Sequence, residues 1–194
     1  TDSTIAHLGL IAMGFGIATE TSVSAAFLHI INHAFVKAAL FMLAGIFIHA
    51  TGSRDIRSYK GVSRFMPYTT FMFLIGALAA IGFPPLSIFW SKLLLVFSVV
   101  EKGGLYIYLL LPILITIIFE AIAQIRVLAI MYSKEPAASF HVPSRFMLFS
   151  IGVLLAITIL IGLAPTFLIE GAGKAAADLI NYAGYIETVL GLVP

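Results

Sequence analysis

The sequence predicts an all-α, polytopic membrane helix bundle. Hydrophobic residues make up 61% of its 194 residues and charged residues only 10%, and the mean hydropathy is +1.09. These values lie outside the range of soluble globular domains. The chain contains no cysteine, which excludes disulfides and thiolate-bound metal clusters on it. Any redox chemistry linked to this chain is therefore expected on a partner.

The first apolar segment, residues 4–18, is short, because about 20 residues are needed to cross the hydrocarbon core. It carries His7, for which a position at the headgroup level and a role in transport are both open. No signal peptide is recognisable before it. Since the chain lacks an initiator Met, we expect either a processed N-terminus or the C-terminal part of a longer polypeptide.

A polar stripe runs through the second apolar segment, residues 23–50, for which Ser22 is the expected N-cap. His29, His33 and Lys37 are spaced i, i+4, i+8. At this spacing they form one stripe along roughly 12 Å of helix axis. Ionisable groups inside a membrane cost on the order of 2.5 to 3.5 kcal/mol each. We therefore expect this stripe to face the protein interior or a hydrated cavity and to mark an ion or proton path.

The loop 51–67 is the most basic part of the chain, with four cations against the single Asp55. The cations are Arg54, Arg57, Lys60 and Arg64. By the positive-inside rule this loop faces the cytoplasm. The alternative is a set of solvated charges with no orienting role.

Two short apolar stretches, 68–83 and 86–100, flank the pair Pro84-Pro85. Each has about 15 residues, roughly 24 Å as a helix, which is short for a complete span. They are either two short spans joined by a Pro-Pro turn or one span broken in the middle. Loop charge favours the broken span, because that topology places the basic loop on the same side of the membrane as the loop 133–145.

The break itself, at Gly82, Pro84 and Pro85, is a candidate transport feature. A non-helical segment at membrane depth is tolerated only where it is buried in protein or lines a hydrated cavity. Lys92 follows seven residues after Pro85 and has mostly apolar neighbours. Snorkelling to an interface is the alternative for such a lysine, but the apolar residues on both sides favour a functional role.

The segment 105–132 carries Glu120, Gln124 and Arg126. Glu120 and Gln124 share one helix face, whereas Arg126 lies near the opposite side of the helical wheel. Glu120 should therefore pair with a neighbour such as Lys92, Lys37 or a partner subunit. Its role is either that of a structural counter-charge or a direct role in transport. Arg126 is expected to be structural.

After a loop at 133–144, residues 145–163 are expected to form a span that packs against the other helices. The tail that follows has an amphipathic spacing, which favours a position along the membrane surface or against another subunit.

Four stretches resemble, in chain order, signatures of one family. Residues 33–45 (HAFVKAALFMLAG) resemble the HAxxKAxLFxxAG signature of the antiporter-like subunits shared by respiratory complex I, Mrp cation/proton antiporters and membrane-bound hydrogenases. Residues 3–9 resemble the family's SSIAHLG segment, residues 82–92 its G-x-P-P-x-x-x-F-x-S-K stretch, and residues 126–134 its R-x-x-x-x-x-F-x-G-K helix end. The resemblance covers nearly the whole chain.

This resemblance implies the second five-helix repeat of such a subunit, with one discontinuous helix, plus a final helix and an amphipathic tail. Residues 1–132 would form the half-channel repeat, residues 145–164 the final transmembrane helix, and residues 165–194 the tail. The family's first repeat, with its buried glutamate and lysine pair, does not match any part of this chain. It is expected on a partner subunit or on the rest of a longer chain.

Buried lysines and histidines pass protons along a hydrated axis in this family. Carried over by position, the translocation residues are His29, His33, Lys37 and Lys92, and the residues that support them are His7, Glu120 and Arg126. The sequence departs from the family pattern at Glu120, which has no matching family role, and at Tyr132 in the helix-end motif.

The expected function is that of a part of a membrane-arm subunit in a multisubunit redox-driven ion pump or antiporter, conducting protons or Na⁺ through a Lys/His relay. The alternative is a structural membrane anchor for a peripheral oxidoreductase without its own ion path. A stand-alone transporter is disfavoured, because sites in such folds lie between two repeats. We expect no catalytic, cofactor or metal site on this chain.

The expected partners are other membrane subunits, peripheral redox subunits and membrane lipid, but no nucleic acid. The expected complex is a proton-translocating oxidoreductase, NADH dehydrogenase-like or hydrogenase-like, or a cation/proton antiporter. The expected location is a prokaryotic cytoplasmic membrane. The electron donor, and whether H⁺ or Na⁺ is carried, stay open.

Overall fold

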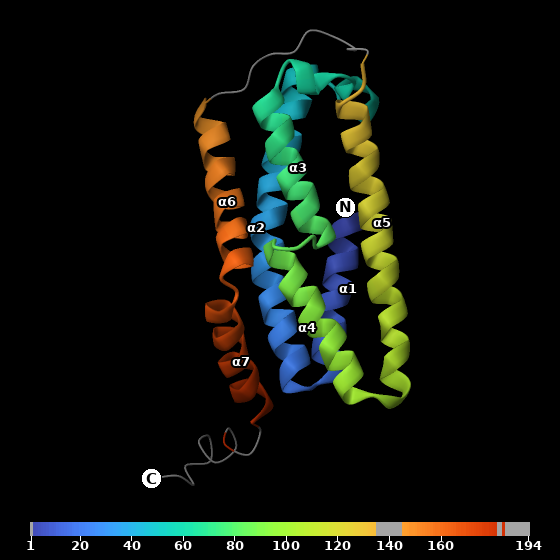
Figure 1. Cartoon of the computed structure of the whole chain (residues 1–194), viewed down its shortest axis with the longest axis vertical. Coiled ribbons are helices and arrows are strands. Elements are labelled where there is room, and N and C mark those ends of the chain that lie inside the picture. The colour runs from blue at the N-terminus through green and yellow to red at the C-terminus, as the bar shows by residue number, and fades with distance from the viewer. Residues whose placement is uncertain (1, 135–144, 182–183, 185–194) are drawn as a thin grey trace.

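The described part of the chain is a bundle of α-helices without strands (Figure 1). The computed structural model describes residues 2–134, 145–181 and 184. Three of the described helices are long and apolar enough to cross a membrane, or four if the bent pair Ile56–Arg64 and Pro67–Ile81 counts as one span. The predicted polytopic membrane helix fold is confirmed.

Helix α2 (Glu20–Thr51) is the central element. Five helices pack on it: α1 (Asp2–Ile17), α3 (Pro67–Ile81), α4 (Ser87–Lys102), α6 (Arg145–Leu163) and α7 (Thr166–Ile180). It is continuous over 32 residues, about 48 Å at 1.5 Å per residue. The predicted N-cap, Ser22, is wrong. Thr19 is the N-cap and Ser22 is the third helical residue, and the two close a reciprocal capping box. Helix α2 therefore begins at Glu20, three residues before the predicted apolar segment 23–50.

The broken span is confirmed as one discontinuous helix. Helix α3 (Pro67–Ile81) ends at Gly82, and α4 (Ser87–Lys102) begins after the cis peptide bond between Pro84 and Pro85. In Figure 1 the two halves follow one another along the bundle and together match the length of α2. Within the basic loop, two short 3₁₀ helices, η1 (Ile56–Tyr59) and η2 (Val62–Arg64), cover the adjoining helix ends.

The remaining elements are the 3₁₀ helix η3 (Gly104–Leu109), α5 (Leu110–Met131), α6 (Arg145–Leu163) and α7 (Thr166–Ile180). Helix α5 packs on α1, α3 and α4. Helix α7 packs on α2 of its own chain through the buried Ala172 and Ala176, beyond the lower end of α6 in Figure 1. A surface position for the tail in the membrane stays a prediction, and residues 185–194 lie outside the described part.

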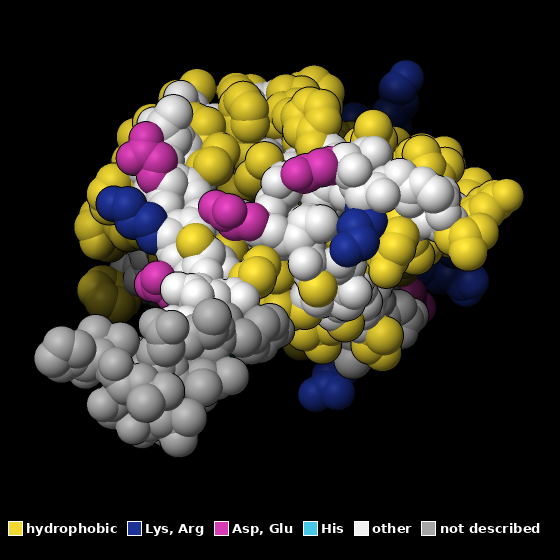
Figure 2. Space-filling view, turned by 90° about the horizontal axis from the view of Figure 1, so that it is seen from below, with side chains coloured by type: hydrophobic (Ala, Val, Ile, Leu, Met, Phe, Trp, Pro, Cys, Tyr) yellow, Lys and Arg dark blue, Asp and Glu magenta, His cyan; other side chains and the backbone are white. Residues whose placement is uncertain are grey.

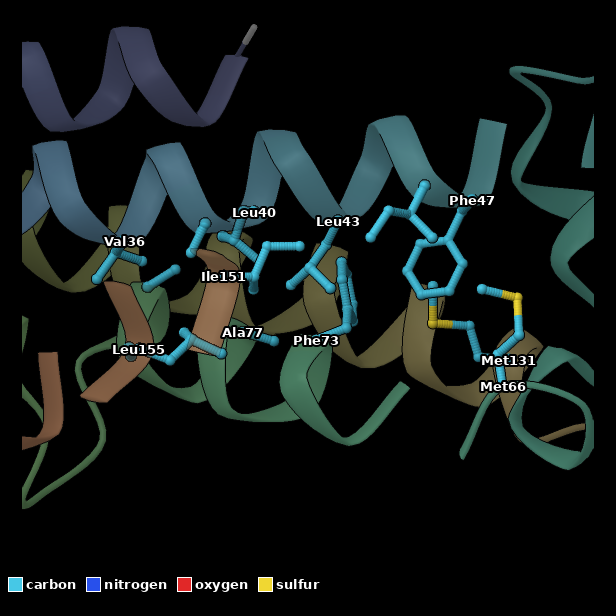
Figure 3. Packing of buried hydrophobic residues seen from close by; sticks show 14 of the residues in the cluster. Val36, Leu40, Leu43, Phe47, Met66, Phe73, Ala77, Met131, Ile151 and Leu155 are labelled. Atoms are coloured by element: carbon cyan, nitrogen blue, oxygen red, sulfur yellow. The ribbon is translucent and has the colours of Figure 1, made fainter. Parts of the chain in front are cut away.

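Two apolar clusters fill the bundle. The larger one surrounds the C-terminal half of α2, where Leu40, Leu43 and Phe47 meet side chains of α3, α5 and α6 (Figure 3). The smaller one joins Leu10 and Ile17 of α1 to residues of α2, α4 and α5 nearer the other end. A polar layer separates the two clusters. On α2, α4 and α5, buried polar residues lie between the residues of the larger cluster and those of the smaller one.

The two ends of the bundle differ in charge. The loop between α2 and α3 carries four cations and one aspartate. At the other end, shown in Figure 2, acidic and basic side chains lie among hydrophobic ones. Among the described residues, the elements in this half of the bundle contribute Glu20, Glu101, Lys102, Glu170, Lys174 and Asp178. The cationic excess is thus at the α2–α3 end.

The backbone of helix α6 closely approaches the backbone of the break between α3 and α4. A Cβ at Gly162 would overlap the carbonyl oxygen of Pro85 and lie 2.8 Å from the Cα of Leu86. The indole Nε1 of Trp90 also donates a hydrogen bond of 2.7 Å to the carbonyl of Gly162. A glycine is therefore required for α6 to contact the broken helix.

We predict that Gly162→Ala destabilises the protein, because overpacking a close contact costs about 1–3 kcal/mol. The apparent Tm of the purified protein in detergent measures the effect. Gly45→Ala in α2 is the matched control, since a Cβ there has nothing within 4 Å. Equal Tm values for the two variants would contradict the prediction.

Candidate functional site

Three imidazole rings from two helices are stacked in the middle of the bundle. The ring of His7 lies 5.0 Å from that of His29 and 4.4 Å from that of His33, between centroids. The rings of His29 and His33 are 6.2 Å apart and nearly parallel. His7 is fully buried inside the bundle.

A row of hydrogen bonds extends through His7 from α5 to α4. The Nε2 atom of His7 lies 2.6 Å from Oε2 of Glu120, and its Nδ1 atom lies 2.8 Å from Nε2 of His29. The Nδ1 atom of His29 lies 2.8 Å from Oγ of Ser91, whose hydroxyl donates to the carbonyl of Ile88. Four helices therefore contribute to one polar layer.

Lys37 joins the same row through a serine. Its Nζ donates a hydrogen bond of 2.5 Å to Oγ of Ser3, and that hydroxyl donates one of 2.6 Å to Oε1 of Glu120. The Nζ of Lys37 is 3.9 Å from the same carboxylate oxygen. The predicted pairing of Glu120 with Lys37 is thus confirmed, and Lys37 is partly buried, with 14% of its side chain exposed. Arg126 is exposed on α5 and takes no part in this row.

Lys92 is buried, with 4% of its surface exposed, and it bonds to the break instead of reaching an interface. Its Nζ donates to the carbonyls of Ala80 and Ile81, at 3.1 and 2.9 Å. These carbonyls belong to the last turn of α3, where helical acceptors lack intrahelical partners. A cation is also favourable at the C-terminal end of a helix. No hydrogen bond among the described residues joins Lys92 to the His7 row.

Polar side chains that the sequence did not single out complete the α2–α4 interface. The Nδ2 of Asn32 donates a hydrogen bond of 2.8 Å to the carbonyl of Ser87. In the described part of the chain, three buried atoms have no hydrogen-bond partner: Oδ1 of Asn32, Nδ1 of His33 and Oγ of Ser87. The i, i+4 spacing of Ser87 and Ser91, and of Ser3 and His7, was the available sequence signal for these residues.

No resident metal centre is evident in the described ranges, which contain no group of three or more His, Asp or Glu residues placed to hold an ion. His7, His29, Lys37, Lys92 and Glu120 each have a protein hydrogen-bond partner instead. His33 contacts the rings of His7 and His29, and its Nδ1 has no hydrogen-bond partner among the described residues. The chemistry that this geometry permits is proton exchange between neighbouring side chains.

Comparisons with known proteins agree with this architecture. Residues 2–119 match the family model described as "NADH:quinone oxidoreductase/Mrp antiporter, TM". A Na(+)/H(+) antiporter subunit of Alkalihalophilus pseudofirmus is 30% identical over 189 residues, which are 96% of this chain and 38% of that protein. The chain therefore spans well under half the length of this curated relative.

Two solved structures share the fold. A chain of the membrane-bound sulfane sulfur reductase, an archaeal respiratory membrane complex, superposes with a TM-score of 0.83 at 29% identity, over 95% of this chain and 37% of that one. A chain of the Mrp complex from Dietzia sp. superposes with a TM-score of 0.84 over 97% of this chain and 43% of that one. At 21% identity the latter shows the fold alone.

We predict that Gly82→Ala disturbs the Lys92 site. Gly82 has a φ of +90°, and a Cβ there would lie 3.1 Å from Cδ of Lys92. Gly52→Ala is the matched control, because Gly52 also has a positive φ, +67°, but nothing within 4 Å of the added Cβ. Both variants carry a backbone cost of about 1–2 kcal/mol. A lower Tm for Gly82→Ala than for Gly52→Ala is expected, and equal values would contradict a tight Lys92 site.

Proposed function

The chain belongs to the NADH:quinone oxidoreductase/Mrp antiporter transmembrane family, and we propose that it forms a proton half-channel in a membrane subunit of a multisubunit pump or antiporter. It is an integral membrane protein. The observation that carries the proposal is the layer of six buried or partly buried ionisable side chains between two apolar clusters. They are His7, His29, His33, Lys37, Lys92 and Glu120.

A structural role alone would not require so many titratable groups in one layer. Ionisable residues inside a membrane are expensive and are typical of ion paths and proton relays. Histidine can give and accept a proton near neutral pH, and its two nitrogens can pass it on in opposite directions. His29, His33 and Lys37, together with Lys92, are the proposed translocation residues.

Water is the proposed link between the histidines and Lys92. Buried polar atoms are nearly always hydrogen-bonded, by protein or by ordered water. Oδ1 of Asn32, Oγ of Ser87 and Nδ1 of His33 have no hydrogen-bond partner in the described residues. Asn32 and Ser87 lie at the α2–α4 interface, where Asn32 donates to the Ser87 carbonyl, and His33 follows Asn32 on α2. Water bound to them would extend the row from Ser91 towards the break.

The proposed division of the chain follows the resemblance: residues 1–132 form the half-channel, 145–164 a final transmembrane helix and 165–194 an amphipathic tail. Other membrane subunits, or the rest of a longer subunit, supply the remaining half-channel, and peripheral redox subunits are proposed partners. The excess of cations at the α2–α3 end supports a cytoplasmic position for the loop 51–67 in a prokaryotic inner membrane.

Lys92→Ala in the intact membrane assembly should abolish ion translocation in proteoliposomes while leaving most of the assembly intact. The reason is that the variant removes the ionisable group at the break. Lys102→Ala on the same helix is the matched control, because Lys102 is exposed at the end of α4. Normal pumping by Lys92→Ala would overturn the proposal.

The anchor function remains the second candidate, and one observation favours it: Glu120 and Lys92 are already satisfied by protein partners. Lys37→Met separates the two functions. Loss of proton uptake with normal levels of the partner subunits is expected for a half-channel. Unchanged proton uptake with normal co-purification would support the anchor instead.

A further inference from the structure

We propose that Glu120 is a proton-carrying residue of the path, and that it joins Lys37 to the histidines. This inference rests on the proposed function and adds to it a residue on α5, a helix from which the family resemblance supplies no relay residue. Glu120 touches both halves of the row, because Oε1 accepts from Ser3 and Oε2 contacts His7. It is 5% exposed.

The directions of the hydrogen bonds place a proton beside Glu120. Since the Ser91 hydroxyl donates to Ile88, it accepts from Nδ1 of His29. A neutral His29 then accepts at Nε2 from Nδ1 of His7. The contact of 2.6 Å between Nε2 of His7 and Oε2 of Glu120 therefore holds one further proton, which resides either on the imidazole or on the carboxyl.

The bonds on the other side of Glu120 all point towards it. Lys37 donates to Ser3, and Ser3 donates to the carboxylate. The shared proton can pass to Nε2 of His7 while His7 releases its Nδ1 proton to Nε2 of His29, which leaves a neutral His7, an imidazolium at His29 and an ionised Glu120. A proton can then move from Nζ of Lys37 to Oγ of Ser3 while the Ser3 proton moves to Oε1. This second step leaves a neutral amine, an unchanged serine and a neutral carboxyl.

Glu120 also lines a cavity of about 420 Å³ between α1 and α5. The cavity is at the surface, because Phe119 and Ile115, which line it, are 68% and 51% exposed. Ser3, Thr116 and Gln124 add polar groups to its lining. Its volume is enough for several water molecules at roughly 30 Å³ each. This cavity is the side access to Glu120 in the proposed path.

Glu120→Gln in the intact assembly tests the relay role, because glutamine keeps the size and hydrogen-bonding capacity of the side chain but does not carry the proton. Proton uptake in proteoliposomes should fall by about 100-fold or more. Infrared difference spectra between acid and alkaline states should contain a protonated-carboxyl band that disappears in this variant. A counter-charge that stays ionised would give no such band.

A cavity variant tests the access without removing a charge. Ala123→Leu fills the cavity, since Ala123 lines it, and should slow proton uptake several-fold. Ala129→Leu is the matched control, because Ala129 is also exposed on α5 but is not part of the lining. Equal rates for these two variants would overturn the side access.

The outcomes separate this inference from the function on which it rests. Normal proton uptake by Glu120→Gln, with loss in Lys92→Ala, would overturn the role of Glu120 and keep the half-channel. Normal uptake in both variants would overturn both. If Glu120→Gln fails to assemble, Ser3→Ala decides, because it removes the hydroxyl that joins Lys37 to Glu120 but removes no charge. Normal proton uptake by Ser3→Ala would overturn the relay role.

Discussion

The structure depends on how charge is compensated inside an apolar helix bundle. Lys37 and the histidine row would each be costly at membrane depth, and one carboxylate, Glu120, contacts both through Ser3 and His7. Breaking a buried pair is far more costly than never forming it, because the remaining charge is left without a partner. The contact between α1, α2 and α5 is therefore specified by polar pairing, whereas the ends of the bundle are specified by apolar packing.

This layered arrangement explains why the polar groups are held in place. In lipid, helices gain little from hydrophobic burial against each other, so shape and hydrogen bonds decide how they pack. The larger apolar cluster surrounds α2 on one side of the layer, and the smaller one joins α1, α4 and α5 on the other. The close approach of Gly162 to Pro85 then fixes α6 against the break. At the break Leu86 is buried, whereas Phe83, Pro84 and Pro85 are exposed in the described part of the chain.

Periodicity and composition were enough to predict the helical membrane fold and the stripe on α2, because each depends on local sequence. The broken helix was predicted from the Pro84-Pro85 pair together with the charge of the loops. The same periodicity separated Glu120 from Arg126, which lie on a buried and an exposed face of α5. Sequence could not select His7 as the partner of Glu120, because these residues are 113 positions apart. A helical pattern shows that a face is polar, but it does not show which other face it meets. The packing of α7 on α2 was missed for the same reason, and the roles of the site residues remain predictions.

The bonds of Lys92 to the end of α3 have a consequence for how the break behaves during titration. A lysine ammonium has three N–H donors, and a neutral amine keeps two. Two carbonyls, those of Ala80 and Ile81, accept from Nζ. Both protonation states can therefore satisfy the same two acceptors, and the backbone does not have to rearrange when the charge changes. The discontinuous helix can then act as a rigid frame around a group whose charge alternates, and the third donor is left to exchange with whatever occupies the space beside it.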